Sequence, residues 1–275
     1  MRCYNHVCDW MTGCDRTMDT RRDGPEDFRE LTCRECENAA SLDFDFTMAF
    51  QPIVDLERGE VFAHEALVRG LDGEPAKTVL DRVDGSNRYR FDQSCRVKAV
   101  KLAAQLGMES QLSINFLPNA IYKPESCIRT TLAATREYGF PEERIIFEVT
   151  EGENIGDPDH LRHIFRYYRE CGFTTAIDDF GAGYAGLSRL AEFQPDFIKL
   201  DMALIRGVDN SLSRQAICQG VVTTCRALAI DIVAEGIETE EELRYLYGLG
   251  IRRFQGFLFA RPALGQLPAV TLPVL

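Results

Sequence analysis

The sequence predicts an α/β protein, specifically a (β/α)8 TIM-like barrel whose first strand runs antiparallel to its neighbours. Three observations support this fold class. Short apolar runs alternate with amphipathic stretches from Met48 onward, as they do in repeated strand and helix units. Eight of the apolar runs fit strands. Between the first two lies only "ERGE" (57–60), which is long enough for an antiparallel turn but too short for a parallel crossover.

Helices are predicted between most of the strands. Residues 88–106 carry apolar side chains at helical spacing. Residues 158–171 do the same, with Asp157 as the N-cap. Thr239 and Glu242 have the spacing of a capping box at the start of another helix. The predicted strands are residues 48–55, 61–68, 112–117, 145–150, 174–179, 197–201, 231–235 and 253–259.

The composition is that of a globular protein that is soluble in water. Of the 275 residues, 45% are hydrophobic and 27% are charged, and the net charge is −12. This charge argues against binding to duplex nucleic acid or to an anionic membrane surface. No apolar run approaches the length of a membrane span, and the first residues contain no apolar signal-peptide core. We therefore expect a cytoplasmic protein.

The first 44 residues differ from the rest of the chain. They lack clear periodicity, and they hold five of the ten cysteines. We predict two regions, a cysteine-rich appendage over residues 1–44 and a barrel domain over residues 45–275. Cys33 and Cys36 form a C-x-x-C pair, which is compatible with a Zn²⁺ site or a redox sensor. The alternative is an appendage without such a role, and a disulfide is disfavoured in the cytosol.

Polar side chains lie at or near the carboxyl end of seven predicted strands. Barrel enzymes build their active sites at this face, from the ends of several strands. Any one of these residues alone is compatible with a carboxylate that faces solvent, but a solvated rim does not require such regularity. The residues are Glu65, Asn115, Glu148, Asp178, Asp179, Lys199, Glu235 and Gln255.

The oxygen-rich donor set indicates two divalent cations. Carboxylate and amide oxygens suit Mg²⁺ or Mn²⁺ better than zinc. Five converging carboxylates would repel one another without cations, and one carboxylate between two cations can bridge both. Two-metal sites catalyse in-line displacement at phosphorus, so phosphodiester hydrolysis is the leading chemistry. Lys199 would then hold or polarise the attacking water.

Three short motifs suggest other functions, and each is disfavoured. Gly181, Gly183 and Gly186 spell G-x-G-x-x-G, a dinucleotide-binding pattern, but the adjacent acidic pair would lie beside the pyrophosphate. "DFG" (179–181) lacks the other kinase motifs. "HEALV" (64–68) lacks the second histidine of a zincin helix.

The ordered motifs of residues 46–264 together resemble the EAL-type cyclic-di-GMP phosphodiesterases. This family folds as a metal-dependent barrel with a reversed first strand, and it opens cyclic di-GMP to linear pGpG. The resemblance also implies two Mg²⁺ or Mn²⁺ ions and a homodimer. The motifs are "FQPIVDL" (50–56), "EALVR" (65–69), "SINF" (113–116), "FEVTE" (147–151), "DDFGAGYAGL" (178–187), "FIKLD" (197–201), "VAEGIET" (233–239) and "FQGFLFARP" (254–262).

The resemblance implies a role for each matching residue. The metal ligands would be Glu65, Asn115, Glu148, Asp178, Asp179 and Glu235, with Asp178 as the bridge. Catalysis would involve Lys199, Glu235, Glu238 and Glu151, the last of which would steady the loop after the aspartate pair. Substrate contacts would come from Gln51, Leu67, Arg69 and Gln255. The alternative function is a catalytically silent cyclic-di-GMP receptor that acts through a protein partner.

The chain departs from the family pattern in one region. Residues 70–91 are short and lack the usual stretch between the arginine and the next helix. Gly70 also replaces the common aromatic residue after Arg69. Both departures concern the predicted wall of the substrate pocket, and neither touches a predicted metal ligand.

Overall fold

A closed barrel of eight strands forms the centre of the structure, a computed structural model that describes residues 41–121, 123–152, 158–183 and 186–273. The strands follow in the order β2-β3-β4-β5-β6-β7-β8-β1, and pairing of β1 with β2 closes the ring. The predicted fold class is therefore confirmed. The strands are β1 (Thr47–Asp55), β2 (Glu60–Arg69), β3 (Gln111–Asn115), β4 (Ile145–Thr150), β5 (Thr174–Phe180), β6 (Phe197–Leu200), β7 (Asp231–Ala234), β8 (Arg253–Gln255) and the short β9 (Ala263–Leu264).

Strand β1 is antiparallel to both of its barrel neighbours, as the short connection predicted. Phe50 lies opposite Ala66 of β2, and Ile53 lies opposite Gln255 of β8. The strands from β2 to β8 pair in parallel. Gly59, in the turn between β1 and β2, has a φ of 68°, a left-handed conformation that glycine adopts without a steric penalty.

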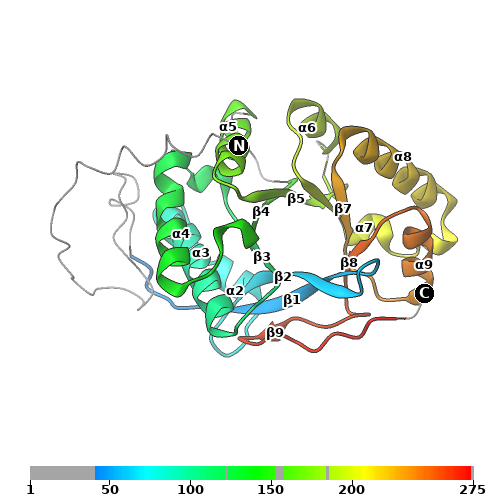
Figure 1. Ribbon diagram of the computed structural model, residues 1–275. Helices are drawn as coiled ribbons and strands as arrows, with labels where there is room; N and C mark the ends of the chain where they lie inside the picture. Colours follow the sequence, from blue (N-terminus) through cyan, green and yellow to red (C-terminus); the bar gives the residue numbers. More distant parts are fainter. Residues whose placement is uncertain (1–40, 122, 153–157, 184–185, 274–275) are drawn as a thin grey trace, which may run out of the picture.

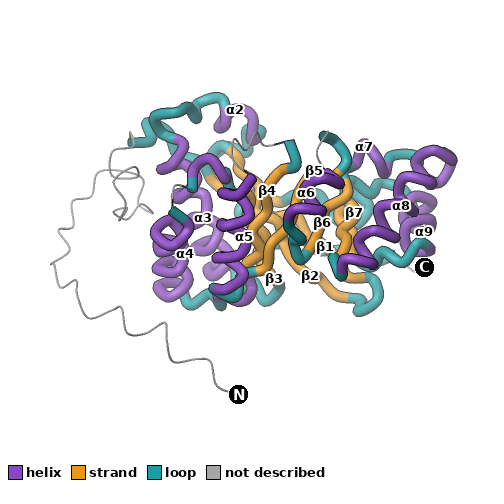
Figure 2. The backbone as a smooth tube through the Cα atoms, turned by 90° about the horizontal axis from the view of Figure 1, so that it is seen from above, coloured by secondary structure: helices purple, strands orange, loops and turns teal. Residues whose placement is uncertain are grey.

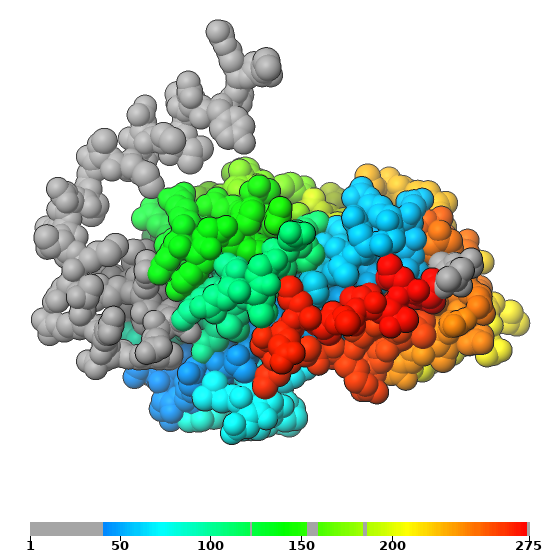
Figure 3. All heavy atoms as spheres, turned by 60° about the horizontal axis from the view of Figure 1, so that its bottom comes forward, coloured from blue at the N-terminus to red at the C-terminus, as the bar shows by residue number. Residues whose placement is uncertain are grey.

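The free part of one β1 edge is covered by the end of the described chain. Strand β8 pairs only with Ile53–Asp55, and β9 pairs with Ala49 and Phe50 further up the same edge. The red C-terminal segment therefore lies along the blue and cyan residues of the first strands (Figure 3). This pairing satisfies backbone groups that an exposed strand edge would leave open.

Helices cover the barrel on opposite sides, with α3, α4 and α5 on one side and α7, α8 and α9 on the other (Figures 1 and 2). The capping box of α9 is present, with Thr239 and Glu242 bonding reciprocally. The predicted N-cap Asp157 lies outside the described residues. No helix in the described part of the chain is long and apolar enough to cross a bilayer. The helices are α2 (Ala76–Leu80), α3 (Arg88–Gln105), α4 (Pro124–Tyr138), α5 (Pro158–Glu170), α6 (Gly186–Glu192), α7 (Met202–Ile205), α8 (Leu212–Leu228) and α9 (Glu240–Gly248), with 3₁₀ turns η1 (Pro118–Ala120), η2 (Glu142–Arg144) and η3 (Val208–Asn210).

Most of the predicted appendage lies outside the described residues. This includes Cys33 and Cys36, so the proposed zinc or redox site stays a prediction. The described chain begins just before Phe44, which is buried. Its ring packs in a tilted arrangement against Phe46 and Phe91, at centroid distances of 6.5 and 6.3 Å. These contacts join the start of β1 to helix α3.

The barrel interior is built in two layers. Because side chains alternate across a strand, residues two apart on one strand both face the interior. The polar layer lies two residues from the apolar layer on each strand, toward the carboxyl ends of the parallel strands. The apolar layer consists of Ile53, Ala63, Ile146, Ala176, Phe197 and Val233, all buried. The polar layer contains Gln51, Glu65, Glu148, Asp178, Lys199 and Glu235.

Arg253 lies at the opposite end of the barrel from the polar layer. Its guanidinium lies over the rings of Phe62 and Phe197, at 4.2 and 4.9 Å from their centroids. It also pairs with Asp231 at 2.7 Å and with Asp55 at 3.5 Å. Together with the apolar layer, this side chain packs at the amino-terminal end of the barrel.

Candidate active site at the carboxyl end of the barrel

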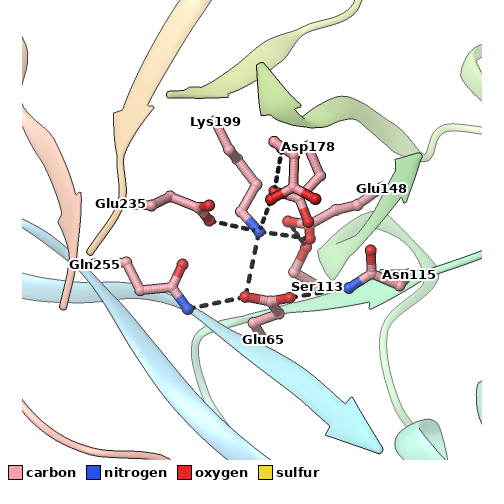
Figure 4. Close-up of polar contacts among 9 residues, drawn as sticks. Glu65, Ser113, Asn115, Glu148, Asp178, Lys199, Glu235 and Gln255 are labelled. Carbon is pink, nitrogen blue, oxygen red and sulfur yellow. Dashed lines mark hydrogen bonds and ion pairs between the residues drawn. The ribbon is translucent and has the colours of Figure 1, made fainter. Parts of the chain in front are cut away.

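The ammonium group of Lys199 is the centre of the polar layer (Figure 4). Its Nζ lies 2.7 Å from Glu235, 2.8 Å from Glu148, 3.1 Å from Asp178 and 3.2 Å from Glu65. The lysine side chain is only 1% exposed, so water cannot screen these contacts. Four carboxylates from the ends of four strands therefore converge at one rim, as the strand-end pattern predicted, and they surround the ammonium group of Lys199.

Three neutral side chains orient the carboxylates. Asn115 and Gln255 each donate an amide hydrogen to Glu65, at 2.9 Å to its Oε1 and Oε2. The Ser113 hydroxyl donates to Oε1 of Glu148. Sequence analysis missed Ser113, although it lies two residues before Asn115 on β3 and so faces the same interior.

Burial and mutual repulsion shift the protonation equilibria of this layer. Burial, together with the charges of Glu65 and Asp178, raises the pKa of Glu148 to about 8, although Lys199 opposes the shift. Burial also raises the pKa of Glu235 well above its usual range. For Lys199, burial opposes the charge, but the surrounding carboxylates outweigh it and raise the pKa. The cluster thus holds more negative charge than one ammonium balances.

The carboxylates form two groups that could each hold a metal ion. Glu65, Glu148 and Asp178 form one group, and Asp178, Asp179 and Glu235 form the other. Ligand oxygens within each group lie within 4.8 Å of one another, and Asp178 belongs to both. If the five carboxylates are ionised and Lys199 is protonated, five negative charges and one positive charge leave a net charge of −4, which two divalent cations would balance. The donor set therefore fits two hard cations that share Asp178.

The turn after β5 carries the adjacent aspartates. Asp179 has a φ of 53°, an uncommon left-handed conformation that aspartate tolerates better than most residues. Its backbone N–H donates to Oδ1 of Asp178 at 2.9 Å. Burial, with the charges of Asp178 and Asp201, raises the pKa of Asp179 to about 6.

Glu151 supports this turn from the end of β4. Its Oε2 accepts hydrogen bonds from the backbone N–H groups of Gly181 at 2.6 Å and Gly183 at 3.4 Å. Its own N–H donates to the carbonyl of Asp178 at 2.8 Å. These contacts are those expected of a residue that steadies the loop after the aspartate pair.

The remaining predicted residues lie outside the contacts of Lys199. Gln51 donates to the carbonyl of Ala260 at 3.4 Å, and Arg69 donates to the carbonyl of Val68 at 2.7 Å. Leu67 is half-buried on β2, two residues beyond Glu65. Glu238 is exposed, and it pairs with Arg206 at 2.7 Å rather than with Lys199; this hydrogen bond lowers the pKa of Glu238.

The departure at Gly70 has a local explanation. A Cβ atom at this position would lie 2.2 Å from a carboxylate oxygen of Glu74. The N–H of Gly70 donates to the carbonyl of Glu74 at 3.0 Å, which closes a tight turn directly after Arg69. A larger side chain at position 70 would therefore require the side chain of Glu74 to move.

Comparison with known proteins gives matches to one family. The family model described as "EAL domain" matches residues 35–262. The blue light- and temperature-regulated antirepressor BluF of Escherichia coli is 34% identical over 226 residues, which cover 82% of this chain and 56% of BluF. The cyclic di-GMP phosphodiesterase RocR of Pseudomonas aeruginosa is 32% identical over 231 residues, which cover 79% of this chain and 57% of RocR. The chain thus spans little more than half the length of these relatives.

Solved structures show the same fold. A standalone EAL protein from Vibrio cholerae O395, in its c-di-GMP-bound form, superposes with a TM-score of 0.82 and 53% identity. The match covers 84% of this chain and 98% of that chain. The manganese/cy-diGMP complex of Klebsiella pneumoniae BlrP1 gives a TM-score of 0.76 and 41% identity, over 80% of this chain and 56% of that chain.

Proposed function

Because this chain belongs to the EAL domain family, as its motifs led us to expect, we propose that it is a metal-dependent phosphodiesterase that hydrolyses cyclic di-GMP to linear pGpG. The observation that carries the proposal is the pair of carboxylate groups joined by Asp178, with Lys199 between them. The relative named as a cyclic di-GMP phosphodiesterase and the c-di-GMP-bound structural neighbour support the substrate. The manganese complex of BlrP1 supports a divalent cation.

Each group of residues has a distinct task in this proposal. Glu65, Asn115, Glu148 and Asp178 hold one Mg²⁺ or Mn²⁺ ion, and Asp178, Asp179 and Glu235 hold the second. Two such ions, when bound, activate a water and stabilise the leaving oxygen of an in-line displacement. Lys199 donates hydrogen bonds that orient the attacking water beside the carboxylates, and Gln255 fixes the orientation of Glu65.

A second set of residues contacts the substrate in this proposal. Arg69 pairs with a phosphate of cyclic di-GMP, and Gln51 and Leu67 line the same wall of the site. Glu151 keeps Asp179 in position by holding the backbone of the following turn. Glu238 adds a further carboxylate near the site, and its pairing with Arg206 holds this carboxylate in place. These roles are proposed from the family resemblance, and each can be tested by a single substitution.

The second candidate is a catalytically silent receptor for cyclic di-GMP. The relative BluF, which is named as an antirepressor, favours this class of function. Loss of catalysis in such receptors is expected to leave gaps in the ligand set. The described chain keeps all six predicted oxygen ligands, from Glu65 to Glu235, so we favour the enzyme.

Incubation of the full chain with cyclic di-GMP separates the two candidates. We expect linear pGpG to appear with Mn²⁺ or Mg²⁺ and to stop appearing with EDTA, measured by ion-exchange chromatography. Asp178→Asn should bind the nucleotide but lose turnover. A chain that binds cyclic di-GMP with Mn²⁺ and leaves it intact is the receptor, and near-wild-type turnover by Asp178→Asn would refute the bridging role.

Two further expectations stay proposals. We propose a homodimer, which light scattering on the full chain would detect as twice the chain mass. We also propose that Cys33 and Cys36 contribute to a Zn²⁺ site in the first 44 residues. Zinc bound per chain, measured by atomic emission, should fall in Cys33→Ser, and zinc-free wild-type protein would refute the proposal.

A further inference from the structure

Asp92, Arg96 and Tyr168 form a buried polar cluster between helices α3 and α5. Asp92 is 3% exposed, and Arg96 and Tyr168 are not exposed at all. The guanidinium of Arg96 pairs with Oδ2 of Asp92, one helical turn away. Its Nη1 lies 3.5 Å from the Tyr168 hydroxyl. A buried ion pair of this kind contributes little net stability compared with well-packed apolar residues, so stability alone does not account for it.

The second oxygen of Asp92 is bonded to the loop that follows β3. Oδ1 accepts the backbone N–H of Leu117 at 2.9 Å. This N–H lies just beyond the regular β3–β4 ladder, which ends with the pairing of Asn115 and Glu148. The intervening Phe116 donates its N–H to the carbonyl of Glu148 at 3.0 Å. Asp92 thus fixes the chain two residues after a predicted metal ligand.

The aromatic packing reinforces the same loop. The ring of Phe116 contacts Tyr168 at a centroid distance of 5.7 Å and Phe147 at 6.0 Å. Tyr168 therefore touches both Arg96 and the residue next to Asn115. The amide of Asn115 in turn donates to Glu65, a ligand of the first carboxylate group. A continuous series of contacts joins the α3–α5 interface to the carboxylate rim.

We infer that the Asp92–Arg96 pair is a positioning device for Asn115, which it holds in register with Glu65 by anchoring the Leu117 N–H. This inference rests on the proposed function, because it assigns Asp92 a part in shaping the first cation site. Arg96 orients the Asp92 carboxyl group in the apolar interior. A charge-assisted acceptor binds a backbone N–H more strongly than a neutral one. Neither residue touches the substrate.

Two double variants isolate the acceptor from the ion pair. Asp92→Leu/Arg96→Met and Asp92→Asn/Arg96→Met both remove the two charges together, which avoids leaving one charge buried and unpaired. Leucine and asparagine have the same branched shape, but only asparagine can accept the Leu117 N–H. Lys98→Met is the control for loss of a buried charge on the same helix, because Lys98 bonds to Asp45 and to the carbonyl of Phe46 at the start of β1.

The first readout is Mn²⁺ affinity, measured by titration calorimetry without substrate. We expect the leucine variant to bind Mn²⁺ about tenfold more weakly, which is the lower end of the effect of removing an outer-shell partner. The asparagine variant and Lys98→Met should stay within about threefold of wild type. Equal affinity in the leucine and asparagine variants, or an equal loss in Lys98→Met, would overturn the inference.

The second readout is hydrogen exchange at the Leu117 amide, which needs neither metal nor a variant. In the wild type we expect this amide to be protected as strongly as the core of α3. An unprotected Leu117 amide would overturn the inference even if the enzyme is active. Wild-type protein that binds no Mn²⁺ would instead refute the proposed function, so the two failures are distinguishable.

Discussion

Replacement of Lys199 by methionine tests the electrostatic account of the site. Methionine is also unbranched, but it lacks the ammonium group that lies 2.7–3.2 Å from four carboxylates. At about 3 Å and an effective dielectric near 20, each contact contributes roughly 5 kcal/mol of attraction. Desolvation and repulsion among the carboxylates largely offset this attraction. Without the ammonium, the repulsion is no longer compensated.

The variant can relieve the repulsion by taking up protons. Relative to the unfolded chain, in which a glutamate has its ordinary pKa near 4.3, protonation of one carboxyl group costs about 4 kcal/mol at pH 7.5. We therefore expect Lys199→Met to lower the free energy of unfolding by about 3–5 kcal/mol at pH 7.5 in EDTA. At pH 5.5 the same protonation costs only about 2 kcal/mol, so the loss should be smaller. Saturating Mn²⁺ should also reduce the loss, because the cations balance the carboxylates.

Urea unfolding followed by far-UV circular dichroism measures these quantities. With a slope of about 3 kcal/mol per molar urea, the expected loss moves the midpoint down by roughly 1–1.7 M. Lys98→Met is the matched control, since Lys98 is also buried but pairs with Asp45, whose side chain is 44% exposed. Its effect should not depend on Mn²⁺. A loss by Lys199→Met below about 1 kcal/mol in EDTA, or one equal with and without Mn²⁺, would refute the reasoning.

Three further predictions concern single contacts. Ser113→Ala removes a hydroxyl that orients a rim carboxylate, so the dissociation constant for Mn²⁺ should rise about tenfold, while Ser110→Ala leaves it unchanged. Burial lowers the pKa of His64 to about 4, so between about pH 6.5 and pH 4 mainly the unfolded state takes up a proton at this residue. Between pH 7 and pH 4, the free energy of unfolding should therefore fall by about 3 kcal/mol more in wild type than in His64→Gln. Equal pH profiles of the two proteins would contradict this. Glu151→Ala removes the acceptor of the Gly181 N–H, so exchange of that amide should accelerate and turnover should fall; unchanged exchange would count against its bracing role.

The gathering of the carboxylates could be predicted because it depends only on period and topology. Parallel strands bring their carboxyl ends to one rim, and alternation sends Glu65, Glu148, Asp178 and Lys199 to the interior. The reversed direction of β1 could also be predicted, because a connection of few residues allows only an antiparallel neighbour. Both arguments use spacing along the chain, which the sequence records directly.

Contacts between distant segments could not be predicted in this way. The role of Ser113 depends on the register between β3 and β4, which brings its hydroxyl to Glu148. The Asp92–Leu117 bond depends on how α3 packs against the barrel. The two residues of β9 are too few to show any period. Glu238 follows Gly236, whose φ of 67° turns the chain beyond β7, and it pairs with Arg206 on the surface.

The two ends of the barrel differ, since apolar side chains pack at the amino-terminal end and the carboxylates lie toward the carboxyl end. Ile53, Phe197 and the guanidinium of Arg253 pack at this amino-terminal end, so we expect Lys199 to be reached from the carboxyl end of the barrel. In the proposed reaction, the linear dinucleotide would then leave by the same end through which the next cyclic di-GMP enters. We expect the linear dinucleotide to compete with its own precursor, so that turnover slows as product accumulates in a closed vessel.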